Sequence, residues 1–155
     1  MKPWKLPWEG GCMCSAVRLR VTLPPLLASA CHCWDCQRMS ASAYSLTLTI
    51  PDKGFELIRG EPVLGGMRAN DVLHYHCPLC KNWLFTRIAA IPDIVNLRPA
   101  VLDDHGWVVP QFETCTNEKM LWAHTPAVQS YQGCPEPDEF DPLMDLFAAC
   151  GSRPV

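Results

Sequence analysis

Seven of the ten cysteines gather in three short groups, and these groups are the residues best suited to chemistry. Two groups are pairs, in GGCMCS and CPLC, and the third is the trio in CHCWDC. Their members are Cys12 and Cys14, then Cys31, Cys33 and Cys36, then Cys77 and Cys80. Thiols crowded in this way form disulfides, hold a metal or supply a reactive thiolate.

The spacing within each group suits a metal ion. Zinc takes four tetrahedral ligands with Zn–S bonds of about 2.3 Å, which places neighbouring sulfurs roughly 3.8 Å apart. A Cys-x-x-Cys turn brings two sulfurs to that separation, and alternate residues of an extended chain project to the same side. Gly10 and Gly11 allow the backbone to bend close to the ion. Thiolate ligands favour zinc over magnesium or calcium, and they suit iron as well.

Seven thiols divide into four and three. Four thiolates close a structural zinc site, whereas three leave one position open, as in catalytic zinc sites. The spacing favours a division in which the trio holds one ion and the two distant pairs meet at the other. It also allows Cys36 to join Cys77 and Cys80, with the remaining four thiols in the other site. In a further alternative both sites are structural, and the second is completed by His32, His74, His76, Cys115 or Cys134.

The composition limits the class of protein. The chain of 155 residues suits one domain with a real core, and its hydrophobic and charged fractions, 48% and 19%, are typical of globular proteins. The net charge of -3 and the scattered Lys and Arg side chains do not suit a nucleic-acid binder. The N-terminus lacks the apolar segment of a signal peptide, and no apolar run reaches the ~20 residues that cross a bilayer. We therefore expect a cytoplasmic protein without a membrane partner. In this reducing compartment, clustered cysteines form metal or catalytic sites more often than disulfides.

Short strands are expected to position the cysteine groups. The fifteen prolines, spread through the chain, disfavour long helices. Alternating apolar and polar residues predict strands at 16–23, 44–50, 54–60, 72–77, 83–91 and 94–100. Two of these flank CPLC and predict a hairpin around it. The expected fold is therefore mainly β, with a single zinc-binding domain over residues 1–135 and a tail over 136–155 in which PLMDLFAAC forms one short helix.

The order of the cysteine motifs resembles that of the glutathione-dependent formaldehyde-activating enzyme family, which includes centromere protein V. The family pattern runs Gly-Gly-Cys-x-Cys-Gly-Ala-Val, Cys-His-Cys-x-x-Cys-Arg, Phe-Cys-x-x-Cys-Gly and Leu-Asp-Asp. The corresponding segments here are GGCMCSAV, CHCWDCQR, HCPLC and VLDD. The chain departs from the pattern at Ser15 and Lys81, which replace glycines, at Gln37, which replaces an arginine, and at His76, which replaces an aromatic residue.

The resemblance implies a β-rich sandwich of the β-tent or Mss4-like kind. It also implies a catalytic zinc held by Cys31, Cys33 and Cys36. The structural zinc would be held by Cys12, Cys14, Cys77 and Cys80. The founding activity of the family joins formaldehyde to the thiol of glutathione, giving S-hydroxymethylglutathione, and is classed as a carbon–sulfur lyase. No zinc ligand is lost among the departures, so metal binding follows more directly from the resemblance than any particular substrate.

The functional hypothesis is thus a zinc-dependent lyase acting on a small-molecule thiol or on its adduct with a small aldehyde such as formaldehyde. The open position at the trio would bind a thiolate or polarise the aldehyde oxygen, and the former is favoured because three thiolates leave a net charge of about -1. Candidates for moving the proton are His32, Asp35, Asp103, Asp104 and His105. Arg38, Arg68 and Lys81 are candidates for pairing with a carboxylate of glutathione, although simple solvent exposure is the preferred interpretation.

The alternative hypothesis is a non-catalytic, zinc-stabilised module. Such a module would bind a protein partner through its β edges or its Trp-rich N-terminus. An enzyme needs the fourth position at the trio to be open, whereas a binding module needs it closed or empty. A homodimer is compatible with either hypothesis.

Overall fold

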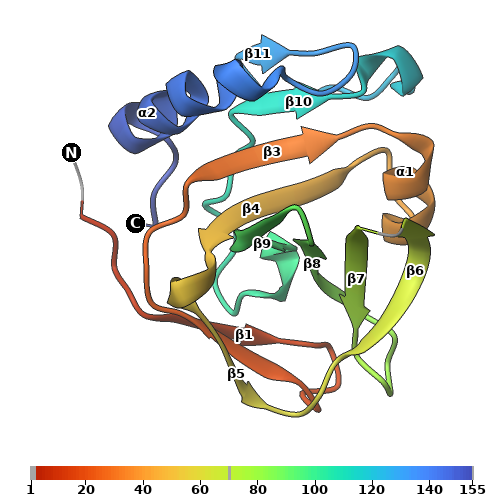
Figure 1. Cartoon of the computed structure of the whole chain (residues 1–155), viewed down its shortest axis with the longest axis vertical. Helices are drawn as coiled ribbons and strands as arrows, with labels where there is room; N and C mark the ends of the chain where they lie inside the picture. The colour runs from red at the N-terminus through yellow and green to blue at the C-terminus, as the bar shows by residue number, and fades with distance from the viewer. Residues whose placement is uncertain (1–2, 70, 155) are drawn as a thin grey trace.

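The computed structural model describes residues 3–69 and 71–154, the side chains of 67–69 excepted, and it is built mainly from short strands (Figure 1). A three-stranded sheet has the antiparallel order β1-β2-β5 and lies at the lower end of the view. Its strands are β1 (Trp8–Gly11), β2 (Arg18–Val21) and β5 (Phe55–Arg59).

The larger sheet has eight strands in the order β11-β10-β3-β4-β9-β8-β7-β6. β10 runs parallel to β3 and β11, and the remaining neighbours are antiparallel. The strand bounds are β3 (Leu27–Cys31), β4 (Ser45–Pro51), β6 (Val63–Ala69), β7 (Val72–His76), β8 (Trp83–Ile88), β9 (Ile91–Leu97), β10 (Phe112–Thr114) and β11 (Gln129–Ser130). The prediction of a mainly β fold is confirmed, and so is the hairpin around CPLC, which β7 and β8 form.

The two helices lie at opposite ends of the larger sheet. α1 (Trp34–Ser40) follows β3 directly and lies near β6, and α2 (Phe140–Cys150) packs beside β10 and β3 (Figure 1). The predicted helix in the tail is therefore present, whereas α1 was not predicted. The strand predicted at 94–100 ends at Leu97, because Pro99 has no N–H to donate and starts a short 3-10 turn.

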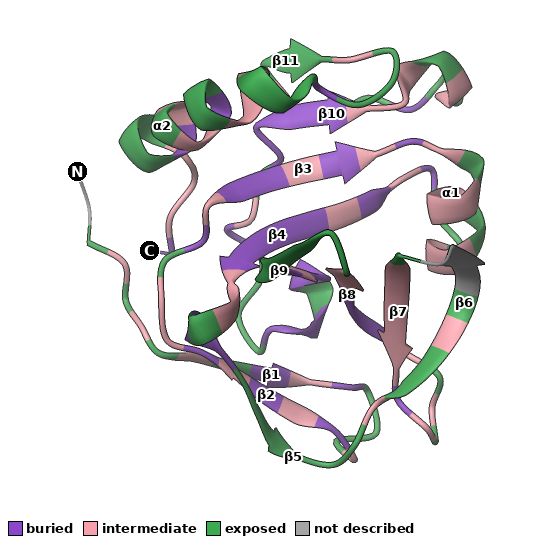
Figure 2. Cartoon of the chain, in the orientation of Figure 1, coloured by how far each residue is buried: buried purple, intermediate pink, exposed green. Residues whose placement is uncertain are grey.

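The core lies between the two sheets and continues beneath α2. Leu19 and Val21 of β2 alternate with polar neighbours, as their strand period requires, and they are fully buried. Buried residues also run along β3, β4 and β10 (Figure 2). Phe147 of α2 is fully buried and stacks on Trp4 at a centroid distance of 6.1 Å. The Trp-rich N-terminus thus packs against the C-terminal helix.

Gly10 fixes the path of β1 into the first cysteine pair. It forms an isolated bridge with Leu102, and a Cβ on Gly10 would lie 2.8 Å from the Leu102 Cα. No other residue allows this approach of two backbones. The chain therefore leaves β1 in a fixed direction, and the turn that carries Cys12 and Cys14 is aimed at the hairpin of β7 and β8.

Candidate metal centres

The two cysteine pairs, which are far apart in sequence, meet in one cluster. Cys12 and Cys14 lie in the turn after β1, and Cys77 and Cys80 lie in the turn between β7 and β8. The four sulfurs all lie within 4.8 Å of one another. The Sγ atoms of Cys12 and Cys14 are 3.5 Å apart, and those of Cys14 and Cys77 are 3.7 Å apart. These distances match the roughly 3.8 Å expected between ligands of one tetrahedral zinc.

Both turns of this cluster close through a residue in the left-handed region. Ser15 has φ 61° and donates its N–H to the Cys12 carbonyl at 2.9 Å. Lys81 also has φ 61° and donates to the Cys77 carbonyl at 3.1 Å. These are the two positions at which the resembling family pattern has glycine. The turns keep a glycine-like conformation although their residues carry a Cβ.

Backbone amides point at the sulfurs of this cluster. The N–H of Val17 donates to Cys12 Sγ at 3.2 Å, and the N–H of Leu79 donates to Cys77 Sγ at 3.4 Å. A hydrogen bond from the Asn82 backbone lowers the pKa of Cys80 to about 6. Amide donors of this kind stabilise the thiolate form, which is the form that binds a metal.

The trio forms a second cluster at the junction of β3 and α1. Cys31 ends β3, Cys33 is the N-cap of α1, and Cys36 lies in the first turn of that helix. The three sulfurs lie within 4.8 Å of one another. The Cys33 side chain accepts the N–H of Cys36 at 3.4 Å, so the cap that starts the helix also fixes two of the three thiols.

The proximity of the trio's thiols makes their ionisation unequal. A hydrogen bond from the Cys36 thiol lowers the pKa of Cys31 to about 5. The same interaction raises the pKa of Cys36 well above its ordinary value. Three neighbouring thiols therefore become thiolates together only when a cation lies among them.

The donor sets fit zinc at both clusters. All ten cysteines are free, and the measured S–S distances are far longer than the ~2.05 Å of a disulfide. Soft thiolate donors in a tetrahedral arrangement are typical of zinc. Each cluster is therefore able to hold a metal ion, and zinc is the ion its chemistry favours.

The structure brings the cysteines together as four and three, in the division that the spacing favoured. The alternative in which Cys36 joins Cys77 and Cys80 does not occur. Within the described residues, no histidine, carboxylate or fourth cysteine has a ligand atom within 4.8 Å of all three sulfurs of the trio. His32, His74, His76 and Cys134 therefore do not complete that cluster, and Cys115 interacts with Cys31 without approaching all three sulfurs.

His32, between two thiols of the trio, points away from them into a buried polar network. Its Nε2 lies 2.9 Å from Glu113 Oε2, and the imidazole is fully buried. Glu113, on β10, also accepts hydrogen bonds from Lys119 at 2.9 Å and from Thr125 and Ser130 at 2.8 Å. Sequence reasoning missed Glu113, because its partners come from segments that only the fold brings together.

Three of the four other candidates for proton transfer, Asp35, Asp103 and His105, are engaged in structural contacts. Asp103 pairs with Arg18 at 2.6 Å, and the hydrogen bond from this guanidinium lowers the pKa of the carboxyl. Nδ1 of His105 lies 3.0 Å from the Leu102 carbonyl. Asp35 lies 3.9 Å from Arg38 on the exposed side of α1. The LDDHG segment thus forms a turn within the loop after β9, connected to β2 through Asp103, and the Asp104 side chain in it is exposed.

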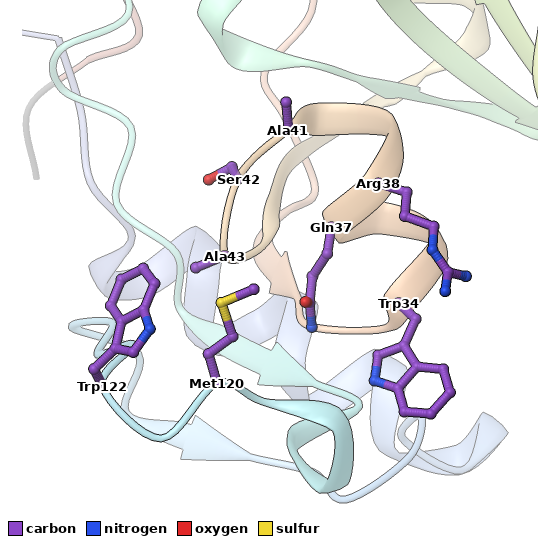
Figure 3. A pocket seen from close by; sticks show the side chains of 8 residues that line it. All are labelled: Trp34, Gln37, Arg38, Ala41, Ser42, Ala43, Met120 and Trp122. Carbon is purple, nitrogen blue, oxygen red and sulfur yellow. The ribbon is translucent and has the colours of Figure 1, made fainter.

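Two hollows lie beside α1. The first, of about 580 Å³, is shown in Figure 3, where Trp34 and Trp122 stand on opposite sides of Met120 and Gln37. Gln37 donates its amide to the carbonyls of His32 at 2.6 Å and of Glu118 at 3.0 Å. Gln37, which departs from the family pattern, therefore connects the trio's loop to the 3-10 turn that follows β10.

The second hollow, of about 490 Å³, lies between the end of α1, the start of β4 and the turn after Cys80. Its lining includes Ser45, Lys81, Trp83 and Arg98. Ser45 is the cross-strand partner of Cys31. Sequence reasoning missed Arg98 as well, although this buried cation reaches the neighbourhood of the trio.

Comparison with known protein families shows to which family the chain belongs. The profile described as glutathione-dependent formaldehyde-activating enzyme matches residues 7–118, a span that contains all seven clustered cysteines. The chain belongs to this family. Its two sheets and paired cysteine clusters are those expected for the zinc-binding, Mss4-like fold of the glutathione-dependent formaldehyde-activating enzymes, so the predicted resemblance and fold class are confirmed.

A solved structure supports the fold. The chain is similar to a Rhodobacter sphaeroides protein determined by structural genomics, with a TM-score of 0.52 and 22% sequence identity. The similarity covers 61% of this chain and 87% of that one. No curated protein matches the sequence significantly. Neither helix in the described part of the chain has the length and hydropathy that crossing a bilayer requires.

Proposed function

We propose that the protein is a zinc-dependent enzyme of the carbon–sulfur lyase type that acts on the adduct of a small thiol with a small aldehyde. The observation that carries the proposal is the trio of Cys31, Cys33 and Cys36, whose sulfurs gather without a fourth protein ligand among the described residues. Three thiolates leave one position of a tetrahedral zinc for substrate. Membership of the formaldehyde-activating family supports the same reaction class.

The proposed reaction is the addition of a thiol to a carbonyl and its reversal. A carbon–sulfur bond forms, the carbonyl π bond opens, and the thiol proton ends on the former carbonyl oxygen. A zinc ion held by Cys31, Cys33 and Cys36 would lower the pKa of a bound thiol and so would supply a nucleophile at neutral pH. The chain's own contribution is to hold three thiolates in place through β3 and the N-cap of α1.

The first test measures metal per chain by elemental analysis. We expect two zinc ions in the wild type, one in Cys33→Ser and two in the control Cys134→Ser, whose thiol is exposed. Circular dichroism should show an unchanged fold in all three proteins. A Cys33→Ser variant that keeps both ions would exclude the trio as a metal site.

The second test measures catalysis directly. Exchange NMR with ¹³C-formaldehyde and glutathione reports how fast the free aldehyde and its thiol adduct interconvert. The zinc-loaded wild type should accelerate this exchange, and Cys33→Ser should not. Equal exchange in both proteins would contradict the proposed site.

A second candidate function, a protein-binding module, is favoured by one observation. Trp34, Met120 and Trp122, which line the first hollow, are 59%, 38% and 70% exposed, so apolar side chains gather on this face of the protein. A protein partner would cover it. If the wild type fails to accelerate the exchange while Trp122→Ser weakens capture of one identified partner, this function replaces the enzymatic one.

A further inference from the structure

His32, between two thiols of the trio, is held both at its backbone and at its side chain. Its N–H donates to the Thr114 carbonyl at 3.0 Å, and its carbonyl accepts the Gln37 amide at 2.6 Å. The fully buried imidazole packs edge-on against Tyr44 at a centroid distance of 5.3 Å. Nε2 lies 2.9 Å from Glu113 Oε2, whereas Nδ1 has no hydrogen-bond partner among the described residues. A carboxylate only accepts hydrogen bonds, so the Nε2–H donates, and this single bond sets the direction of the ring.

Glu113 is itself fixed, so it gives this hydrogen bond a definite direction. The residue is 5% exposed, and its Oε2 also accepts the Thr125 hydroxyl at 2.8 Å. Its Oε1 accepts the Ser130 hydroxyl at 2.8 Å and the Lys119 ammonium at 2.9 Å. Lys119 is the cation that balances the buried charge, whereas the side chain of Arg68, a cation considered from sequence, lies outside the described residues.

The hydrogen bond between His32 and Glu113 joins the two strands that lead into the trio. β10 runs parallel to β3, with Thr114 opposite Cys31, and both strands end at these residues (Figure 1). Cys31 and Cys33 flank His32 in the chain, so a shift of His32 moves both thiols. The sulfurs around one tetrahedral zinc must stay roughly 3.8 Å apart. The position of His32 therefore decides how well the thiols are arranged before an ion binds.

We propose that His32 and Glu113 are positioning residues for the metal ion of the trio. Glu113 fixes the ring of His32, and His32 fixes the thiols of Cys31 and Cys33, although neither residue offers a ligand atom to the cluster. The inference rests on the trio as the metal site of the proposed function. His32, considered from sequence as a group that moves a proton, thus acts through its neighbours instead. Removal of residues that hold metal ligands in place typically lowers metal affinity by about 10- to 100-fold.

The test measures the zinc affinity of both clusters by competition with a chromophoric chelator, and Cys33→Ser, which loses the trio's ion, assigns the two affinities. His32→Leu removes the hydrogen bond but leaves Glu113 its three other donors, so the buried carboxylate keeps its cation. We expect the affinity of the trio to fall about tenfold or more and that of the four-cysteine cluster to remain unchanged. His32→Gln places an amide N–H near the position of Nε2 and should keep most of the trio's affinity.

The ratio of the two affinities separates positioning from a purely structural role. Lower stability would weaken zinc binding at both clusters, because metal binding is coupled to folding. Ser130→Ala, the matched control, removes a donor to the other oxygen of the same carboxylate and should leave the ratio unchanged. Glu113→Gln should lower the trio's affinity, but it should lower it no further when added to His32→Leu, because Glu113 acts through His32. If Glu113→Gln does not fold, the two His32 variants decide.

The outcomes also distinguish this inference from the proposed function. A His32→Leu variant whose trio keeps the wild-type affinity, or whose two clusters weaken equally, would overturn the inference. The exchange of ¹³C-formaldehyde with its thiol adduct is a separate measurement. If the wild type does not accelerate that exchange while His32→Leu weakens zinc binding at the trio alone, the positioning role is supported and the proposed function is contradicted.

Discussion

At the scale of single residues, the turns of the four-cysteine cluster have residues with a Cβ at positions whose backbone conformation favours glycine. Ser15 and Lys81 both adopt φ 61°. For a residue with a Cβ this region costs about 1–2 kcal/mol. The Lys81 ammonium donates to the Pro78 carbonyl at 2.6 Å, whereas the exposed hydroxyl of Ser15 makes no hydrogen bond among the described residues.

Ser15→Gly should therefore raise the free energy of unfolding by about 1 kcal/mol, since glycine adopts this backbone conformation without strain. Urea denaturation of the zinc-loaded protein measures the change. Ser15→Ala keeps the Cβ and serves as the matched control, for which no gain is expected. A gain of the same size in both variants would mean that the serine hydroxyl, not the backbone, is unfavourable.

At the scale of elements, the hydrogen bonds of Glu113 connect β10 to the segments packed around it. Its carboxylate is buried and receives hydrogen bonds from four segments. Burial alone would raise the pKa of Glu113, but the hydrogen bonds, led by that from Lys119, outweigh burial and lower the pKa to about 2 from its ordinary value of 4.5. The folded state therefore favours the charged carboxylate.

Glu113→Gln should lower the free energy of unfolding by about 3 kcal/mol at neutral pH, because it removes one partner of a buried charged network. A folded pKa below the unfolded one gives stabilisation that is complete above pH 4.5 and is lost as the pH falls toward 2. The difference between wild type and variant should shrink across this window. Urea denaturation at several pH values measures it.

The exposed Glu61→Gln is the control for this series, and it should match the wild type at every pH. Because acid releases any bound zinc from wild type and variant alike, the comparison isolates the carboxylate. A Glu113→Gln difference that stays constant from pH 6 to pH 2 would show that the carboxylate's charge does not contribute.

The strands were predictable where their sequence alternates and were missed where it does not. β2 and β4 were found because Leu19, Val21, Leu46 and Leu48 alternate with polar residues. β3 has the sequence LASAC, whose small residues show no clear alternation of apolar and polar side chains, and β6 contains Gly65 and Gly66. α1 has seven residues and no buried side chain, so it carries no apolar stripe for sequence reasoning to detect.

At the scale of the whole molecule, the four-cysteine cluster lies between the small sheet and the large one, so a metal ion bound there would cross-link the two. Cys12 and Cys14 leave the small sheet, and Cys77 and Cys80 belong to the hairpin of β7 and β8. The trio, in contrast, lies within one continuous segment. The two clusters should therefore differ in how much a bound metal contributes to the stability of the fold.

Cys77→Ser should destabilise the protein far more than Cys36→Ser, because it breaks a cross-link between distant segments. We expect a loss above about 3 kcal/mol for Cys77→Ser and less than half of that for Cys36→Ser. Thermal unfolding followed by circular dichroism measures both, and the exposed Cys150→Ser provides the control. Equal losses for the two variants would contradict a purely local role for the trio.

The candidate site was predictable to the extent that its residues are close in sequence. The seven cysteines were found and correctly divided because their spacing reflects ligand geometry. Arg98 and Glu113 were missed because their partners are distant in the sequence. Arg98 contacts a residue of β4, and Glu113 contacts residues of the loops after β10. The role of a buried charged residue can be recognised only when the fold shows which residues surround it.

The separation of 63 residues between Cys14 and Cys77 also has a consequence for how the protein is made. The trio is complete on a nascent chain as soon as residue 36 leaves the ribosome, whereas the four-cysteine cluster waits for residue 80 and for the closure of a long loop. The trio is thus able to bind an ion before either sheet is complete. An ion that binds the unfolded chain in this way would add less to stability than an ion bound only at the four-cysteine cluster.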